Sequence, residues 1–351
     1  MTETQLTQSQ SILLDFMRFF LAAVVVVGHG FGFFLGYFDG FFPRVFPHPQ
    51  SIAVVGFFYL SGFLIVGSQL RQSDKGESSL GKYLFDRTAR VYVTLIPSLL
   101  FVAAVDLSLQ KLNAANVDLV TNNTSLKFFK DNLFLIPSMP YGTMRPIWSL
   151  MYEWWIYVLF GGVYFLKSNR LLAPLLILAG MHYTLKVNAG GVAGHIWIIW
   201  ALGGVCAYLQ QKISWKNLNR HVLDALSVLL LIAAGWLYLI SKNAYSLPAG
   251  IFLGLFLFIF TSKASRFLRL LLPHKVVAKN LAGLSFTLFL THYTVLTYTK
   301  ECLKLDGWAG LTVGVLISIL VAFLIALFTE YKLPEIKSVI SRAGQRVARI
   351  I

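Results

Sequence analysis

The chain has 351 residues, of which 57% are hydrophobic and only 13% are charged, and its mean hydropathy is +0.68. A soluble globular domain carries about 25% charged residues, so this chain cannot cover a surface that faces water. The composition excludes a disordered protein, a fibrous protein and an ordinary cytosolic enzyme. It indicates a polytopic membrane protein.

Ten apolar runs follow one another along the chain, and most approach the roughly 20 residues that a spanning helix needs. They predict an all-α bundle of about ten transmembrane helices that forms one domain over residues 1–351. Residues 1–10 form a polar N-terminus, and residues 329–351 form a basic, amphipathic tail that we expect to lie on the anionic inner leaflet. The ten runs cover residues 11–36, 51–70, 91–109, 147–166, 171–186, 195–210, 222–240, 248–262, 281–299 and 309–328.

The distribution of basic residues predicts the orientation of this bundle. With the N-terminus inside, the inner loops and the tail hold 20 of the 30 Lys and Arg residues, and the outer side holds nine. Because inner loops are enriched in Lys and Arg, both termini are predicted to be cytoplasmic and the loop 110–146 to lie outside. The same rule accounts for the net charge of +15, so we expect membrane lipids and no nucleic acid as partners. Two isolated cysteines give no zinc pattern, and no metal site is predicted.

The first run carries Arg18 and His29, which are 11 residues apart and therefore share one helix face, about 16 Å apart along the axis. Ionisable groups inside a membrane helix are costly, so each is a functional candidate. Two structural interpretations stay open at this point. Arg18 can be an interfacial arginine that reaches lipid phosphates, and His29 can be a hydrogen-bonded structural histidine.

Small and basic residues mark the next two runs. Ser61 and Gly62 lie within the second run, where their spacing alone favours a close helix contact. Arg87 and Arg90 are three residues apart at the inner end of the third run, so they share a helix face. They can clamp a phosphate or can simply belong to the positive inner side.

Later in the chain, Glu153 lies in an apolar, Trp-rich run, where a carboxylate needs a proton, a cation or a hydrogen-bond donor. A purely structural pairing would also satisfy it. His292 lies near the outer half of the ninth run, and a lone histidine there is more often structural than catalytic. Glu330 and Glu335 begin the tail and indicate a solvated inner face.

Five segments in this order resemble motifs of the membrane-bound acyltransferase 3 family. They are Leu14-Asp15-Phe16-Met17-Arg18 followed by His29, FFYLSGFL at 57–64, Arg87-Thr88-Ala89-Arg90 with Tyr92, Trp148-Ser149-Leu150 with Glu153, and residues 284–292, which end at His292. The family often has further acidic character after its WSLxxE segment, whereas this chain continues Trp154-Trp155. A second carboxylate with a role is therefore not expected here. The length resembles the stand-alone type, without a fused extracytoplasmic hydrolase-like domain.

The resemblance implies a reaction and its substrates. It implies transfer of an acyl group, usually acetyl, from cytoplasmic acyl-CoA, which serves as a co-substrate and not as a permanently bound cofactor. The acceptor is expected to be a hydroxyl of a cell-surface glycan, a lipid-linked glycan or another extracellular metabolite. The expected location is the inner (plasma) membrane, as a multi-pass protein.

Roles for the candidate residues follow from this chemistry. A hydroxyl acceptor needs a general base, and neutral imidazole suits that role, so His29 is the predicted base. Glu153 is expected to orient it, as a carboxylate orients the histidine of a catalytic triad. The residues expected to contact the substrates are Arg18, Arg87 and Arg90 for the donor phosphates, Ser61 and Trp148 for the acyl channel, and His292.

Two other classes of function remain open on sequence alone. A proton-coupled transporter or a glycan flippase would use the same intramembrane Arg, His and Glu residues as a proton relay. It predicts inverted repeats and interrupted helices, and the sequence shows no such repeat. A non-enzymatic membrane scaffold would leave His29 and Glu153 without a purpose.

Overall fold

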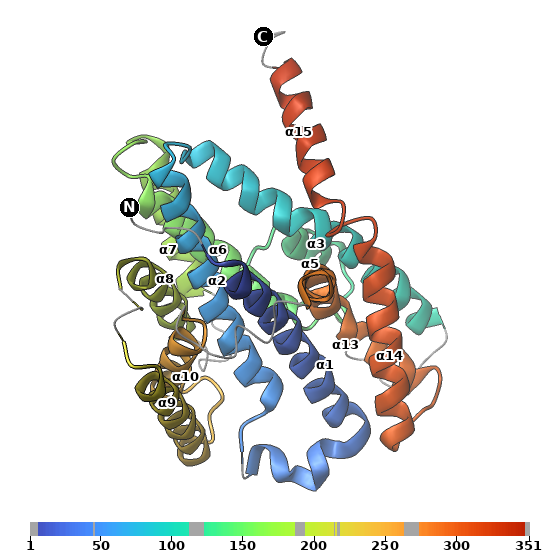
Figure 1. The fold of residues 1–351 in the computed structure, drawn as a ribbon. Coiled ribbons are helices and arrows are strands. Elements are labelled where there is room, and N and C mark those ends of the chain that lie inside the picture. Colours follow the sequence, from blue (N-terminus) through green and yellow to red (C-terminus); the bar gives the residue numbers. More distant parts are fainter. Residues whose placement is uncertain are drawn as a thin grey trace.

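A computed structural model describes residues 6–44, 46–111, 123–186, 194–213, 215, 218–262 and 274–347. Within these residues the chain forms helices and no strand (Figure 1). The helices are α1 (Gln8–Arg44), α2 (Pro49–Asp74), α3 (Leu80–Lys111), α5 (Leu126–Leu133), α6 (Ile147–Tyr164), α7 (Leu172–Lys186), α8 (Ile196–Lys212), α9 (Arg220–Ser241), α10 (Leu247–Phe260), α12 (Lys275–Ala282), α13 (Ser285–Glu301), α14 (Gly307–Ala326) and α15 (Leu333–Val347).

Each of the ten predicted runs is a helix, which confirms the all-α polytopic bundle. Among the described residues, α1, α2, α3, α9 and α14 are long and apolar enough to cross a membrane by length and composition. Helices α7, α8, α10 and α13 have 15, 17, 14 and 17 residues. At 1.5 Å per residue they reach about 21–26 Å, less than the roughly 30 Å of a hydrocarbon core. Membrane crossing by these four and by α6 therefore stays a prediction.

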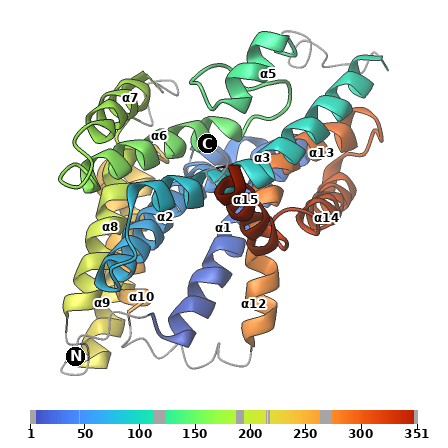
Figure 2. The same ribbon diagram turned by 90° about the horizontal axis from the view of Figure 1, so that it is seen from above.

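Helix α1 lies in the middle of the bundle (Figure 1). It packs against α2 on one side and against α12, α13 and α14 on the other. Helix α8 packs against α2, and α10 joins α8 to the peripheral helix α9, whose most apolar stretch is only 11% buried. Seen from above, α6 and α7 run as a pair beside α2, and α3 crosses between α6 and α13 (Figure 2). This arrangement leaves α9 at the periphery and places α1 and α2 between other helices.

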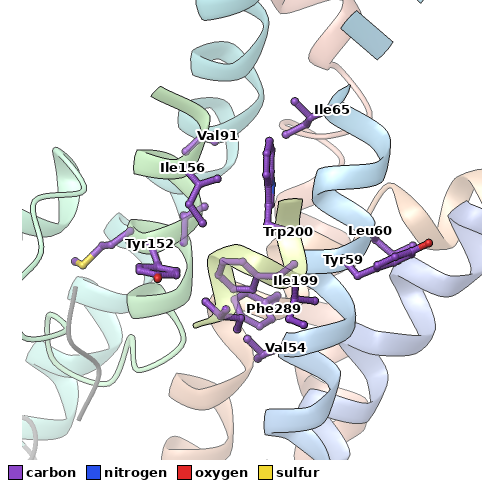
Figure 3. Packing of buried hydrophobic residues seen from close by; sticks show 14 of the residues in the cluster. Val54, Tyr59, Leu60, Ile65, Val91, Tyr152, Ile156, Ile199, Trp200 and Phe289 are labelled. Carbon is purple, nitrogen blue, oxygen red and sulfur yellow. The ribbon is translucent and has the colours of Figure 1, made fainter. Parts of the chain in front are cut away.

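A close glycine contact joins α2 to α8. A Cβ atom on Gly62 would lie 1.9 Å from the carbonyl oxygen of Trp200, and one on Gly203 would lie 2.1 Å from that of Tyr59. Only glycine permits this approach of two backbones, which is the usual way to pack helices in a membrane. The small-residue contact expected at Gly62 is thus present. Around it, side chains of α2, α6, α8 and α13 converge in one apolar core (Figure 3).

Polar contacts join segments of the bundle that are distant in the sequence. The Gln10 side chain, at the start of α1, donates to the carbonyl oxygen of Thr261 at 3.0 Å, just after α10. At the opposite end, the Thr143 hydroxyl contacts Thr294 of α13 at 2.8 Å. The first contact joins the start of one run to the end of another, as the predicted topology requires. Which end faces the cytoplasm stays a prediction.

Of the loop predicted over 110–146, residues 112–122 lie outside the described residues, and the structure describes the loop from residue 123 onward. It contains the short helix α5, and Thr143 donates its backbone N–H and its hydroxyl to the buried Asp106 carboxylate, at 2.9 and 2.6 Å. The preceding Gly142 has a φ of +48°, and a Cβ there would lie 1.8 Å from Asp106 Oδ2. Residue 142 therefore has to be glycine, and Asp106 fixes this loop against the C-terminal part of α3.

The start of the tail corrects one expectation. Glu330 does not lie on a solvated face, because its carboxylate accepts hydrogen bonds from the Thr287 N–H at 3.0 Å and the Thr287 hydroxyl at 2.6 Å. It thereby satisfies a donor that the first turn of α13 leaves free. Glu335 is exposed as predicted and pairs with Lys332 at 3.1 Å. Helix α15 then projects from the bundle (Figure 1).

Candidate functional site

A cavity of about 420 Å³ lies between α1, α2, α3, α6, α13 and the start of α15. We call it the donor cavity. Five of the residues predicted from the sequence line it, namely Arg18, Ser61, Arg87, Arg90 and Glu153. Arg71 and Lys337 add two further cations, and the apolar part of the wall includes Phe57, Phe58, Leu60, Leu64 and Phe289. The cavity therefore has a basic region and an apolar region.

Arg87 and Arg90 of the donor cavity lie within electrostatic range of the Glu153 carboxylate but form no close ion pair with it. Within the part of the chain that the structure describes, no carboxylate forms an ion pair with Arg71, Arg87 or Arg90. The Nε of Arg87 is buried without a hydrogen-bond partner, and its guanidinium lies 5.9 Å from the centre of the Tyr83 ring. Removing a charge from water without a partner is costly, so an anion that enters the cavity gains strong, charge-assisted contacts.

The remaining cations of the cavity already have acidic neighbours. Arg18 lies 3.9 Å from Asp15, which is a loose pair in the same helix. Lys337 of α15 pairs with Asp86 of α3 at 2.7 Å, and this contact ties the tail helix to the mouth of the cavity. The strongest attraction for an anion therefore lies between the ends of α2 and α3.

From the sequence alone, Arg71 counts only among the basic residues of the predicted inner loop after the second run. The signal that reveals it is the spacing along α2, because Ser61, Leu64, Ser68 and Arg71 follow at intervals of three or four residues and all line the cavity. Because Ser68 and Arg71 lie on the same face of α2 as Ser61, the spacing alone predicts that all three line one cavity.

Glu153 belongs to a hydrogen-bonded chain inside the donor cavity. The Trp200 indole N–H donates to Ser61 Oγ at 3.1 Å, Ser61 lies 3.0 Å from the Tyr157 hydroxyl, and that hydroxyl donates to the Glu153 carboxylate at 2.5 Å. Each hydroxyl has one proton, so Ser61 donates to Tyr157 and the chain runs from the indole to the carboxylate. These contacts fix Glu153 between α2 and α6.

The expected contact between Glu153 and His29 is not present. Among the described residues, no hydrogen bond or ion pair joins them, because α6 presents Glu153 to α2 whereas the His29 ring faces α13. Trp148 likewise lies apart from the donor cavity and packs edge-on against Tyr245, with ring centres 6.0 Å apart. It therefore does not line the acyl channel that we expected it to shape.

The two candidate histidines form a pair. The rings of His29 and His292 lie 5.3 Å apart, and Tyr293 meets His29 edge-on at the same distance. His292 is fully buried, whereas His29 is half-buried. The Nδ1 of His292 lies 3.0 Å from the carbonyl oxygen of Leu288, so Nδ1 carries the proton and Nε2 is left as a buried acceptor without a partner. We call these two residues the histidine pair.

The histidine pair does not line the donor cavity, yet it lies close to the cavity wall. Phe289 borders the cavity, and its ring centre is 6.3 Å from that of His292, one turn further along α13. The predicted catalytic residues are thus divided, because Glu153 lines the donor cavity whereas His29 lies beside it with His292, which was predicted to bind substrate. The described residues contain no group of His, Cys, Asp and Glu that could hold a metal ion.

A basic cavity within a bundle of apolar helices, next to a pair of histidine rings, defines a helical membrane protein with ionisable groups in its interior. The family model for the acyltransferase domain matches residues 12–327, and the chain therefore belongs to the acyltransferase 3 family. It is a membrane acyltransferase, as its motifs predict. No curated protein and no solved structure matches the chain.

Proposed function

We propose that the protein is an acyl-CoA-dependent O-acyltransferase of the inner (plasma) membrane. It transfers an acyl group, which we expect to be acetyl, to a hydroxyl of a cell-surface or lipid-linked glycan. The observation that carries this proposal is the donor cavity, whose unpaired arginines lie at one end and whose apolar wall reaches Phe289 beside the histidine pair. The family favours acyl transfer over a transporter or a flippase.

The basic region suits the donor. Coenzyme A carries a pyrophosphate and a further phosphate, so it presents several negative charges close together. Arg71, Arg87 and Arg90 offer planar guanidinium groups that bind phosphate with two N–H donors each. The acyl group and its thioester then extend along the apolar wall.

The histidine pair suits the proton transfer. A sugar hydroxyl is a poor nucleophile until a base takes its proton. We assign this role to His29, because its side chain is partly exposed, whereas that of His292 is fully buried. As the proton moves to His29, the hydroxyl oxygen bonds to the thioester carbon. The carbon–sulfur bond then breaks, and the proton passes to the leaving thiolate.

Purified protein in lipid nanodiscs tests both halves of the proposal. Titration calorimetry with coenzyme A measures donor binding, and dephospho-coenzyme A, which lacks one phosphate, should bind more weakly. Membrane vesicles that contain the protein and the cell's own surface glycans measure transfer of radiolabel from acetyl-CoA to the glycan fraction. Label that appears in this fraction only with the unaltered protein, and not with His29→Ala, supports the proposal. No binding of coenzyme A by correctly folded protein would contradict it.

A further inference from the structure

Two aromatic rings that touch each other form part of the apolar wall of the donor cavity. Phe57 of α2 and Phe289 of α13 both line the cavity, and their ring centres lie 5.6 Å apart in an edge-to-face contact. Phe289 is only 8% exposed, so neighbouring side chains hold it in place. We call Phe57 and Phe289 the aromatic constriction.

The aromatic constriction stands between the donor cavity and the histidine pair. The ring of Phe289 borders the cavity and also approaches the ring of His292, at 6.3 Å between centres. His292 in turn lies 5.3 Å from His29. Phe289 therefore lies between the cavity and His292, and Phe57 packs against Phe289 from the cavity side.

We propose that Phe57 and Phe289 select the acyl group by its size, and that they let only a short chain pass from the donor cavity to the histidine pair. This inference rests on the proposed function. The cavity wall next to the constriction is apolar, with Phe58, Leu60 and Leu64, so a longer acyl chain is not rejected by polarity. Only the space beside the two rings sets a limit. A short acyl group passes with a small rotation of Phe289, and each added methylene requires a larger one.

The expected discrimination is large enough to measure. One methylene in an apolar pocket typically changes kcat/KM about 10–200-fold. The coenzyme A part of the donor is the same for every chain length and binds to the basic region. The constriction should therefore change kcat with chain length and leave donor affinity nearly constant. A general loss of folding would instead lower the activity with all donors together.

Transfer from acetyl-, butyryl- and hexanoyl-CoA to the glycan fraction of membrane vesicles tests this inference. Phe289→Ala and Phe57→Ala should raise the ratio of butyryl to acetyl transfer at least tenfold. Phe289→Leu keeps most of the buried volume, so it should fold even where alanine does not, and it should shift the ratio in the same direction. The matched control is Phe63→Ala, since Phe63 is a buried phenylalanine of α2 that packs against Tyr59 and does not line the cavity. Its ratio should not change.

The outcomes separate this inference from the function on which it rests. If the unaltered protein transfers no acyl group of any length, the proposed function fails. If it transfers acetyl but the chain-length ratio stays the same in Phe57→Ala, Phe289→Ala and Phe289→Leu, the proposed function stands and the aromatic constriction does not select the acyl group. A ratio that also rises in Phe63→Ala would trace the effect to loosened packing and overturn the inference as well.

Discussion

The donor cavity and the histidine pair lie next to each other but differ in charge and polarity. The cavity gathers more cations than carboxylates, and Arg71, Arg87 and Arg90 form no close ion pair among the described residues, so an anion that binds there gains charge-assisted contacts. The histidine pair gathers aromatic rings around two imidazoles and leaves His292 Nε2 without a hydrogen-bond partner among the described residues. One region presents several cations to a cavity, and the other buries an acceptor nitrogen among aromatic rings. The difference teaches that binding and proton transfer can be altered separately.

The largest expected effect tests the histidine pair. His29→Ala should reduce turnover about 10²–10⁴-fold, because a positioned base contributes that much, while coenzyme A still binds. His29→Gln keeps a polar side chain but cannot take a proton at neutral pH, so it should be as inactive as His29→Ala. The measurements are acetyl transfer in membrane vesicles and calorimetry with coenzyme A. A fully active His29→Gln protein would move the base to His292.

The next effect tests the donor cavity. Loss of one charge-assisted phosphate contact costs about 1.5–3 kcal/mol, so Arg87→Ala should weaken binding of coenzyme A roughly tenfold to a hundredfold. Arg71→Ala should do the same, since Arg71 lines the cavity at the end of α2. Arg87→Lys should recover only part of the affinity, because a point charge cannot replace the planar guanidinium.

A control arginine sharpens this test. Arg220 is exposed at the start of α9, away from the donor cavity, and Arg220→Ala should leave the affinity for coenzyme A unchanged. Equal affinities in Arg71→Ala, Arg87→Ala and the control, with normal folding, would show that the cavity arginines contribute only inner-side charge.

A smaller effect, on stability, is expected from the contact between Gly62 of α2 and the backbone of α8. In Gly62→Ala the new methyl group would meet the backbone of α8, which cannot move aside as a side chain can, so α2 and α8 have to separate. Overpacking of this kind costs about 1–3 kcal/mol. Thermal unfolding in detergent should show a lower Tm. Gly81→Ala is the matched control, because its Cβ meets nothing within 4 Å, and an unchanged Tm in both variants would contradict the close contact.

The smallest expected effect concerns the ion pair at the mouth of the cavity. The Lys337 and Asp86 side chains are 26% and 21% exposed, and such a pair contributes about 0.2–1 kcal/mol. Asp86→Asn removes a negative charge from the donor cavity and should tighten coenzyme A binding slightly at low salt. Lys337→Met should weaken it by at most about fivefold. If Asp86→Asn and Lys337→Met change the affinity for coenzyme A in the same direction, the ion pair affects folding and not the electrostatic potential in the cavity.

The sequence by itself determined the helices and the chemical type of the site. All ten apolar runs became helices, because a long stretch without charges has to satisfy its own backbone hydrogen bonds when it leaves water. The RxxR spacing placed Arg87 and Arg90 on one face, and both line the donor cavity. These features depend on neighbours within about one helical turn, so local order is enough to predict them.

Only the tertiary structure decided which helices share a site. The contact between His29 and His292, the hydrogen bond of Tyr157 to Glu153 instead of an orienting contact to His29, and the place of Arg71 in the cavity wall all depend on packing between helices distant in sequence. That packing is set by shape, as in the approach of Gly62 to the α8 backbone. Apolar surface of one helix is equally compatible with many partners, and only the closest fit of small and large side chains selects among them.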